Sequence, residues 1–148
     1  KEFVCNVYMN IVESAIDYVR NKALEIKKDP TWTDIPFKKK KDFMTRMQEA
    51  EKVLAKYPDR IPIICERANT DAPRLDRSKY LVPTDISMGE FMYVIRKRMK
   101  ILPEISIYLF VGGDNLAPVS HTMGMIYDRY RDEDKFLYII YSGEATFG

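Results

Sequence analysis

The stretch KYPDRIPIICER, residues 56–67, is where the sequence changes from a helical pattern to a strand pattern. Before it, apolar residues of the segment 42–56 recur at the spacing of one helix face: Phe43, Met47, Ala50, Val53 and Leu54. After the break at Pro58, the mostly apolar run 60–67 is typical of a strand. We therefore expect a helix over 42–56 followed directly by a strand over 60–67.

Outward from this point, the same patterns predict the remaining elements. Strands are expected at 79–82, 105–111 and 136–142, and helices at 3–26, 88–101 and 122–131. Ser87 and Glu90 have the spacing of a capping box at the start of the central helix. After two leading helices the order is β-β-α-β-α-β, which indicates an α+β fold. Its expected form is a ubiquitin-like β-grasp, a four-stranded mixed sheet with a central helix, preceded by N-terminal helices.

The composition is that of a globular protein and excludes several classes of function. The 148 residues suffice for one domain with an appended element, and the formal net charge of +2 is too small to indicate a polyanion partner. The basic residues 96–98 lie within a helix and lack interleaved aromatic residues for stacking on RNA. Two cysteines without CxxC spacing argue against a disulfide scaffold and a structural zinc site. No apolar run reaches the ~20 residues of a membrane span, so we expect a cytosolic, reducing compartment.

Catalysis would have to use Cys65 and His121, because His121 is the single histidine. Cys65 lies in an apolar strand pattern, where a thiol is a small buried hydrophobe rather than an activated nucleophile. His121 precedes Thr122 at an expected helix start and is explained as a capping or surface residue. The sequence contains no Gly-rich phosphate loop and no HExxH motif. We expect no catalytic activity, no cofactor and no metal.

Several stretches resemble the autophagy-related protein 8 family of ubiquitin-like modifiers, which includes the microtubule-associated light chain and receptor-associated branches. They are KYPDRIPIICERA (56–68), KYLVP (79–83), FMYVIRKRM (91–99) and YSGEATFG (141–148). The resemblance covers residues 37–148 and departs from the family in residues 1–34 and in the turn 69–77. The helical spacing within 3–26, which has no counterpart in the family, predicts an N-terminal amphipathic helical extension over 1–35. Residues 36–148 would form the modifier domain, with its own N-terminal helix and a flexible C-terminal tail.

The segment 79–82 is short and adjoins a proline, so we expect it at a sheet edge where an extended peptide can add as a strand. By resemblance, this edge binds the aromatic-x-x-aliphatic motif of cargo receptors and adaptors. The implied aromatic pocket is lined by Glu49, Val53, Pro62, Ile64, Lys79, Leu81 and Phe136. The implied aliphatic pocket is lined by Tyr80, Val82, Pro83, Ile86, Phe91 and Val94. The pattern alone explains Ile64, Phe91 and Val94 better as core, and the resemblance makes them pocket-lining as well.

The resemblance further implies that Gly148 is conjugated to phosphatidylethanolamine. The implied partners are a processing cysteine protease, activating and conjugating enzymes, and a phosphatidylethanolamine membrane. A glycine has no Cβ, so its carboxylate can enter a narrow active site. The protein would be cytoplasmic, and on the autophagosome membrane when lipidated. The alternative is a non-conjugated ubiquitin-like peptide-binding adaptor in trafficking.

Two features within residues 32–41 have two interpretations each. Trp32 and Ile35 have the aromatic-x-x-aliphatic spacing themselves. They either pack on their own domain or dock into a neighbouring molecule, which would give self-association. The lysine run 38–41 is either a solvated patch or a surface attracted to anionic membrane.

Overall fold

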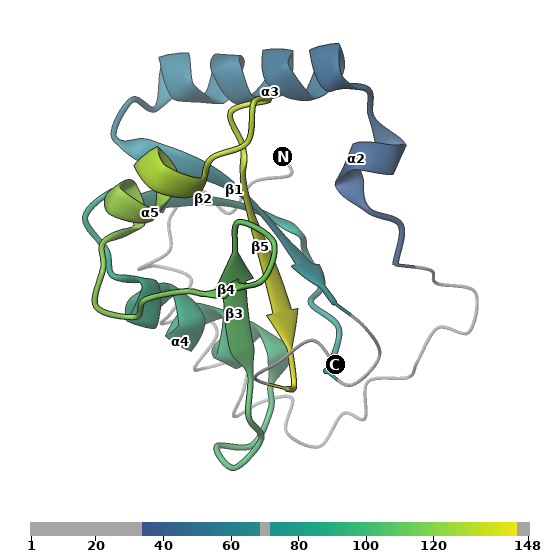
Figure 1. The fold of residues 1–148 in the computed structure, drawn as a ribbon, viewed down its shortest axis with the longest axis vertical. Helices are drawn as coiled ribbons and strands as arrows, with labels where there is room; N and C mark the ends of the chain where they lie inside the picture. The colour runs from purple at the N-terminus through teal and green to yellow at the C-terminus, as the bar shows by residue number, and fades with distance from the viewer. Residues whose placement is uncertain (1–33, 69–71, 145–148) are drawn as a thin grey trace.

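The computed structural model of the chain describes residues 34–68 and 72–144 (Figure 1). The predicted helix over 3–26 and Trp32 lie outside these residues. In chain order the elements are α2 (Phe37–Lys40), α3 (Phe43–Lys56), β1 (Arg60–Arg67), β2 (Lys79–Pro83), α4 (Met88–Met99), β3 (Tyr108–Val111), β4 (Asn115–Leu116), α5 (Met123–Tyr130) and β5 (Leu137–Ser142).

The strands form one mixed sheet in the order β2-β1-β5-β3-β4. β1 and β5 are parallel, and the other neighbouring pairs are antiparallel. The ubiquitin-like α+β class expected from the sequence is confirmed. The sheet has a fifth strand where four were expected, because the two residues of β4 fold back on Phe110 and Val111 after the Gly112-Gly113 turn. The sequence could not predict β4, because a strand of two exposed residues is too short to show an alternation of apolar and polar positions.

The side chain of the residue before each of the longer helices caps its N-terminus. Asp42 accepts from Thr45 N at the start of α3, and Thr122 accepts from Met125 N at the start of α5. At the start of α4, Ser87 Oγ accepts from Glu90 N over 3.1 Å, which confirms this part of the predicted capping box.

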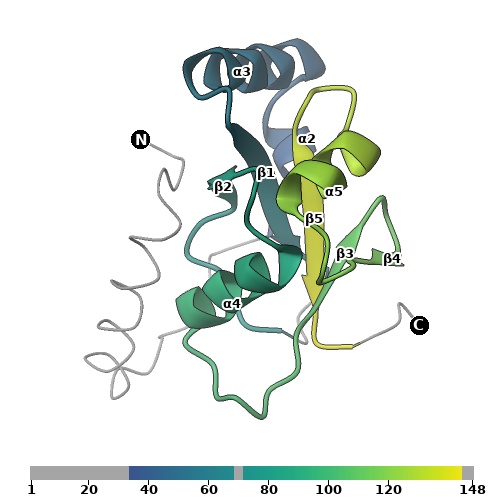
Figure 2. The same cartoon turned by 90° about the vertical axis from the view of Figure 1, so that its left-hand side faces the viewer.

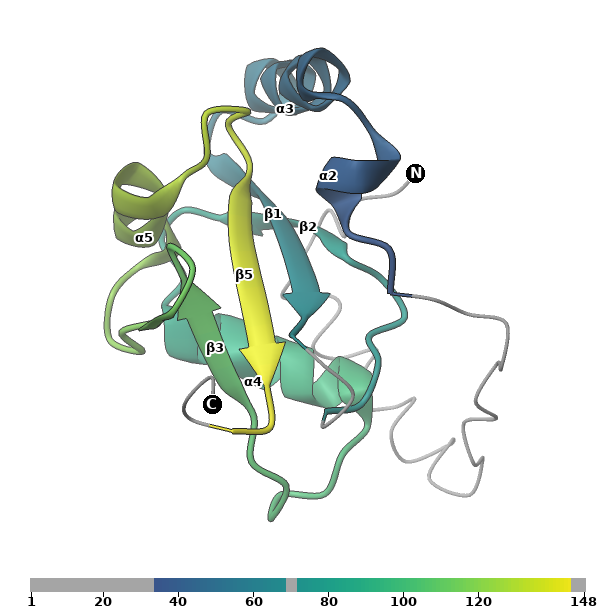
Figure 3. The ribbon, with the colours of Figure 1, turned by 45° about the vertical axis from the view of Figure 1, so that its right-hand side comes forward.

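The sheet has an apolar cluster on each face. The larger cluster includes Ile63, Val82, Phe91, Val94 and Ile139 and lies between the sheet and α4. The smaller one consists of Phe37, Ala50, Ile64 and Phe136, with Tyr138 packed against it. Figures 2 and 3 show α4 along one face of the sheet, while α2 and α3 lie beyond its other side and one end. Successive strand residues point to opposite faces, so each strand contributes to both clusters.

Candidate peptide-binding site

β2 forms one edge of the sheet within the described part of the chain, where β1 is the only strand that pairs with it. Just before β2, Cys65 N donates to Ser78 O over 2.7 Å. In an antiparallel pair every second residue bonds to the partner strand, so this bond shows which residues of β2 bond to β1. Tyr80 and Val82 therefore direct their backbone groups toward β1, and Leu81 directs its amide and carbonyl outward. Outward-facing groups of this kind can accept an extended peptide as a further strand.

The residues implied to line the aromatic pocket lie on the α3 side of the sheet. They come from α3 (Glu49, Val53), β1 (Pro62, Ile64), β2 (Lys79, Leu81) and the residue before β5 (Phe136). In the register of β1 and β2, Ile64 is opposite Lys79 and Pro62 is opposite Leu81. Glu49 and Val53 are one helical turn apart and half-buried, whereas the apolar residues of the strands are buried. The fold thus brings these residues to one side of the β1–β2 pair.

Glu49 is the polar centre of this group. Its Oε1 accepts a hydrogen bond from Lys79 Nζ at 2.8 Å and another from Lys41 Nζ at 3.1 Å. Its Oε2 is buried and has no hydrogen-bond partner among the residues that the structure describes. A buried acceptor without a donor is costly. An N–H group of a ligand that reached Glu49 Oε2 would remove that cost.

Phe37 and Lys41 belong to this site, although the sequence analysis did not assign them to it. The Phe37 ring packs edge-to-face on Phe136 with centroids 5.3 Å apart, and Lys79 Nζ lies 5.0 Å from the Phe37 centroid. Lys41 Nζ lies 5.6 Å from the same centroid and pairs with Glu49, so it is not simply a solvated lysine. The sequence feature that could have pointed to these two residues is an aromatic residue directly before a lysine run, because a lysine side chain can then fold over the ring.

The residues implied to line the aliphatic pocket lie on the α4 side. Tyr80, Val82, Ile86, Phe91 and Val94 have no exposed surface and belong to the larger core, while Pro83 is half-buried. Tyr80 packs edge-to-face on Phe91 at 5.7 Å, and its hydroxyl donates to Arg77 O. Burial raises the pKa of Tyr80 well above its ordinary value. A ligand side chain can enter here only if these core residues move.

A buried ion pair fixes α3 on the sheet next to the aromatic pocket. Arg46 Nε donates to Asp134 Oδ2 at 2.9 Å, and Arg46 Nη1 donates to Lys41 O at 2.8 Å. Asp134 Oδ1 accepts from Phe136 N, and Asp134 Oδ2 accepts from the Tyr138 hydroxyl. Burial opposes the charge of Arg46, yet the hydrogen bond to Asp134 raises its pKa overall. This ion pair therefore positions Phe136, one of the pocket residues.

An open cleft of about 480 Å³ adjoins the aromatic pocket beyond the N-terminal end of β2. Residues 34–37 and Lys40 line one side, and 65–68, 75–78 and 140–141 complete it. Ile35, the second residue of the proposed self-docking motif, lines this cleft and is exposed. Asp34 accepts a hydrogen bond from Arg67, and Glu66 accepts one from Phe37 N at 2.7 Å. The cleft shares none of the residues implied to line the aromatic and aliphatic pockets.

The groups considered for catalysis are in structural roles. Cys65 is 1% exposed, and burial raises the pKa of its thiol, which suppresses the reactive thiolate. His121 precedes the cap of α5, and its carbonyl accepts from Met88 N at 2.9 Å. Over residues 34–68 and 72–144, no group of three or more His, Cys, Asp or Glu residues is placed to hold a metal ion. None of the described helices is long and apolar enough to cross a membrane.

The fold and the edge of β2 define the class of the protein, a ubiquitin-like β-grasp protein. A family model described as autophagy protein Atg8, ubiquitin-like, matches residues 45–148. Autophagy-related protein 8 of Mycosarcoma maydis is 53% identical over 114 residues, which are 76% of this chain and 95% of that protein. The protein of the same name from Emericella nidulans is 51% identical over 113 residues, with the same coverage of both chains.

Solved structures agree with these relatives. The crystal structure of Trypanosoma brucei ATG8 has 45% sequence identity and a TM-score of 0.70, and the match covers 78% of this chain and all of that one. Plasmodium falciparum Atg8, solved in complex with an Atg3 peptide, has 32% identity and a TM-score of 0.71 over 76% of this chain and 99% of that one. The chain belongs to the Atg8 family of ubiquitin-like autophagy proteins.

Proposed function

We propose that this chain binds peptides at the edge of β2 and is conjugated through Gly148 to phosphatidylethanolamine. The observation that carries the peptide-binding part is the outward-facing edge of β2, whose side chains divide between two sides. Ligand residues three positions apart in an extended strand likewise point to opposite faces. An aromatic residue and an aliphatic residue at i and i+3 therefore suit one site on each side of the edge.

If the aromatic and aliphatic residues bind at the two implied pockets, the orientation of the peptide relative to β2 follows. The aromatic residue lies near Lys79 and the aliphatic residue near Val82 and Pro83, so the peptide runs parallel to β2. Glu49 Oε2, buried and without a partner in the described residues, would accept an indole N–H. Arg60, which is opposite Pro83 in the register, and Lys79 favour acidic residues beside the motif, mainly through the association rate and specificity.

Binding on the α4 side includes a rearrangement. Because Ile86, Phe91 and Val94 have no exposed surface, an aliphatic ligand side chain has to displace part of the core. On the α3 side the strand residues are buried as well, but Glu49 and Val53 are partly exposed at the rim, so this side is the more accessible one. The aromatic residue would therefore bind first and the aliphatic residue second.

The conjugation part of the proposal rests on the family and on the sequence YSGEATFG. An activating enzyme would join the Gly148 carboxylate to the AMP unit of ATP and release pyrophosphate. A cysteine thiolate of that enzyme would displace AMP to form a thioester, which passes to a cysteine of the conjugating enzyme. The amine of phosphatidylethanolamine would then attack the thioester carbonyl, and the thiol would leave. In this scheme the chain supplies the acyl group and catalyses none of the steps.

The proposal includes the partners and the location of the protein. The Plasmodium relative solved with an Atg3 peptide supports binding to a conjugating enzyme. A processing cysteine protease would expose Gly148, and cargo receptors and adaptors would bind the edge of β2. The protein would be cytoplasmic before conjugation and on the autophagosome membrane after it. Residues 1–35 would act as an extension of the domain 36–148, and Trp32 and Ile35 would mediate self-association.

Conjugation is tested by incubating the full chain with activating and conjugating enzymes, ATP and phosphatidylethanolamine liposomes. We expect a mass increase of one lipid and flotation with the liposomes, both strongly reduced in Gly148→Ala at an unchanged melting temperature. An adaptor that is not conjugated would show neither effect but would still bind peptide. Peptide binding is measured separately by calorimetry, with a Trp-x-x-Leu peptide and the same peptide with both anchor residues replaced by Ala. Equal heats for the two peptides would exclude docking of the motif.

A further inference from the structure

Exposed apolar side chains gather where α4 leads into β3. Leu102 and Ile105, in the turn after α4, are 48% and 43% exposed, and Tyr93 on α4 is 47% exposed. Large apolar side chains exposed singly are ordinary, but neighbouring ones mark a surface that a partner can cover. We call Tyr93, Lys97, Lys100, Leu102 and Ile105 the α4–β3 patch.

Arg96 holds this turn in one conformation. Its Nη1 donates to Ile105 O at 2.6 Å, and its Nη2 donates to Leu102 O at 3.1 Å and to Pro103 O at 3.2 Å. Within the turn, Ile105 N donates to Leu102 O at 3.1 Å. The two exposed apolar side chains are thus carried on a fixed turn and are presented to solvent before any partner arrives.

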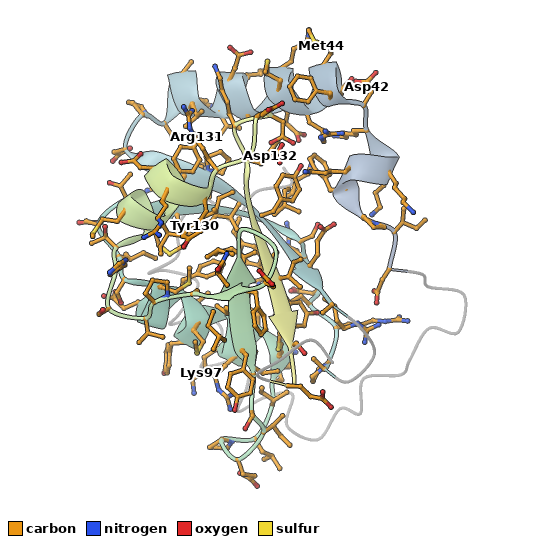
Figure 4. The ribbon with its side chains drawn as sticks, viewed as in Figure 1. Asp42, Met44, Lys97, Tyr130, Arg131 and Asp132 are labelled. Atoms are coloured by element: carbon orange, nitrogen blue, oxygen red, sulfur yellow. The ribbon has the colours of Figure 1, made fainter. Side chains whose placement is uncertain are left out.

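Basic residues of α4 and its end precede the two apolar residues of the turn. Tyr93, Arg96, Lys97 and Lys100 are spaced i, i+3, i+4 and i+7, so they lie along one side of α4 and its end. Lys97 Nζ lies 5.1 Å from the Tyr93 ring centroid (Figure 4). Lys100, which is exposed, follows the last residue of the helix and has a left-handed backbone conformation. Glu104 is the acidic residue of the turn itself. Positive charge therefore exceeds negative charge in the patch.

The patch lies at the end of the sheet from which the chain continues to Gly148. Tyr108, at the start of β3, is opposite Ser142, at the end of β5. In Figures 1 and 3 the turn projects past this end of the sheet, in the direction in which β5 points. Gly148 follows Ser142 by six residues, and an extended segment of that length spans about 20 Å. A group attached to Gly148 is therefore within reach of the turn.

We propose that the α4–β3 patch lies against the surface of an anionic bilayer once the chain is attached to lipid. The inference rests on the proposed conjugation of Gly148, because that attachment brings this end of the sheet to the membrane. Leu102 and Ile105 would enter the headgroup region, and Lys97 and Lys100 would lie among anionic headgroups. A projecting turn with apolar tips that follows a basic helix end suits an interface of this kind better than a protein partner, whose anchor residues fill concave, well-packed pockets.

The experiment attaches the protein to vesicles without the conjugating enzymes. The full chain with a hexahistidine tag after Gly148 is bound to phosphatidylcholine vesicles that contain a nickel-chelating lipid, with or without phosphatidylserine. Hydrogen exchange of residues 101–107 is then compared with the soluble protein. We expect exchange to slow by about tenfold or more on vesicles with phosphatidylserine, and by less without it.

Two double variants identify the groups responsible. Leu102→Ser with Ile105→Ser should lose the protection. Leu116→Ser with Val119→Ser, at the other end of β3 and 54% exposed at both positions, should retain it. Hydrogen exchange on both kinds of vesicle at the same rate as in the soluble protein would overturn the proposal and leave the patch to a protein partner. Protection of the Leu102/Ile105 variant equal to that of the wild type would overturn it as well. The tag attaches the chain to the vesicle without conjugation, so the exchange experiment tests the contact between the patch and the membrane alone. The conjugation of Gly148 is tested separately by the mass increase and flotation described above.

Discussion

The two faces of the sheet hold their helices by different means. On the α4 side the core is large and apolar, and Phe91, Val94 and Ile139 have no exposed surface. On the α3 side the apolar cluster is small, and polar bonds complete it. The Arg46–Asp134 pair and the Lys79–Glu49 pair lie on this side, both with one partner or more nearly buried.

Because of this difference, the α4 side contributes most to stability, whereas the α3 side can more easily accommodate a ligand. Close apolar packing makes any rearrangement of the α4 side costly, so this side fixes the fold. The α3 side contains hydrogen bonds that can be exchanged, and one carboxylate oxygen of Glu49 has no donor in the described residues. The face with the weaker core is the one on which the proposed ligand would bind first. The expected effects below run from the largest to the smallest.

Phe91→Ala tests the apolar side and should have the largest effect. The ring is fully buried and contacts Tyr80, so its loss leaves a cavity in the main core. The expected loss of unfolding free energy is about 3–5 kcal/mol, measured by urea denaturation. A loss below 1 kcal/mol would show that the core between α4 and the sheet is not closely packed.

Asp134→Ala tests the polar side. Arg46 would lose its ion partner while remaining nearly buried, and Phe136 N and Tyr138 Oη would lose their acceptor. We expect a loss of about 3 kcal/mol, with faster hydrogen exchange in α2 and α3 than in α4. The double variant Arg46→Met with Asp134→Leu should recover part of the stability. Equal exchange changes on both sides of the sheet would contradict the division between the two faces.

Glu49→Gln tests the proposed site while keeping the shape of the side chain and a hydrogen-bond acceptor. The amide still accepts a hydrogen bond but has no charge, so a donor from a ligand is held less strongly. We expect the affinity for a Trp-x-x-Leu peptide to fall by roughly tenfold, and the affinity for the Phe-x-x-Leu analogue to fall by less. Calorimetry with both peptides gives this ratio. Equal losses would show that Glu49 does not accept the indole N–H.

Lys38→Met should have the smallest effect, mostly above acid pH. Burial would raise the pKa of Asp132, but hydrogen bonds from Lys38 Nζ and Asp134 N outweigh it and hold the pKa below its ordinary value. A carboxyl with a lowered folded pKa stabilises the protein above its unfolded pKa, and this contribution is lost as the pH falls through the folded value. The variant should be less stable than the wild type by under about 1 kcal/mol at pH 7. Urea denaturation near pH 2 should give a smaller difference, because the contact of Lys38 Nζ with the Tyr138 ring, 4.5 Å from its centroid, then remains to be lost.

The order of the elements could be predicted from the sequence because it depends on local patterns. The change of period at KYPDRIPIICER, the Ser87 cap and the apolar face of α4 each involve neighbouring residues. The Arg46–Asp134 pair could not be predicted, because the two residues are far apart in sequence and each resembles an ordinary surface charge. Phe37 was missed because α2 is too short to show a helical period. The roles assigned to the two pockets come from the family resemblance and remain predictions.

The central place of β5 has a consequence for the synthesis of the chain. β5 is the last strand in sequence, but it lies between β1 and β3, so the sheet cannot close until residue 142 has been made. Until then β1 and β3 have no partner on their inner sides, and unpaired strand edges of this kind favour pairing with other chains. A chain without β5 would therefore have two open strand edges in place of the centre of the sheet.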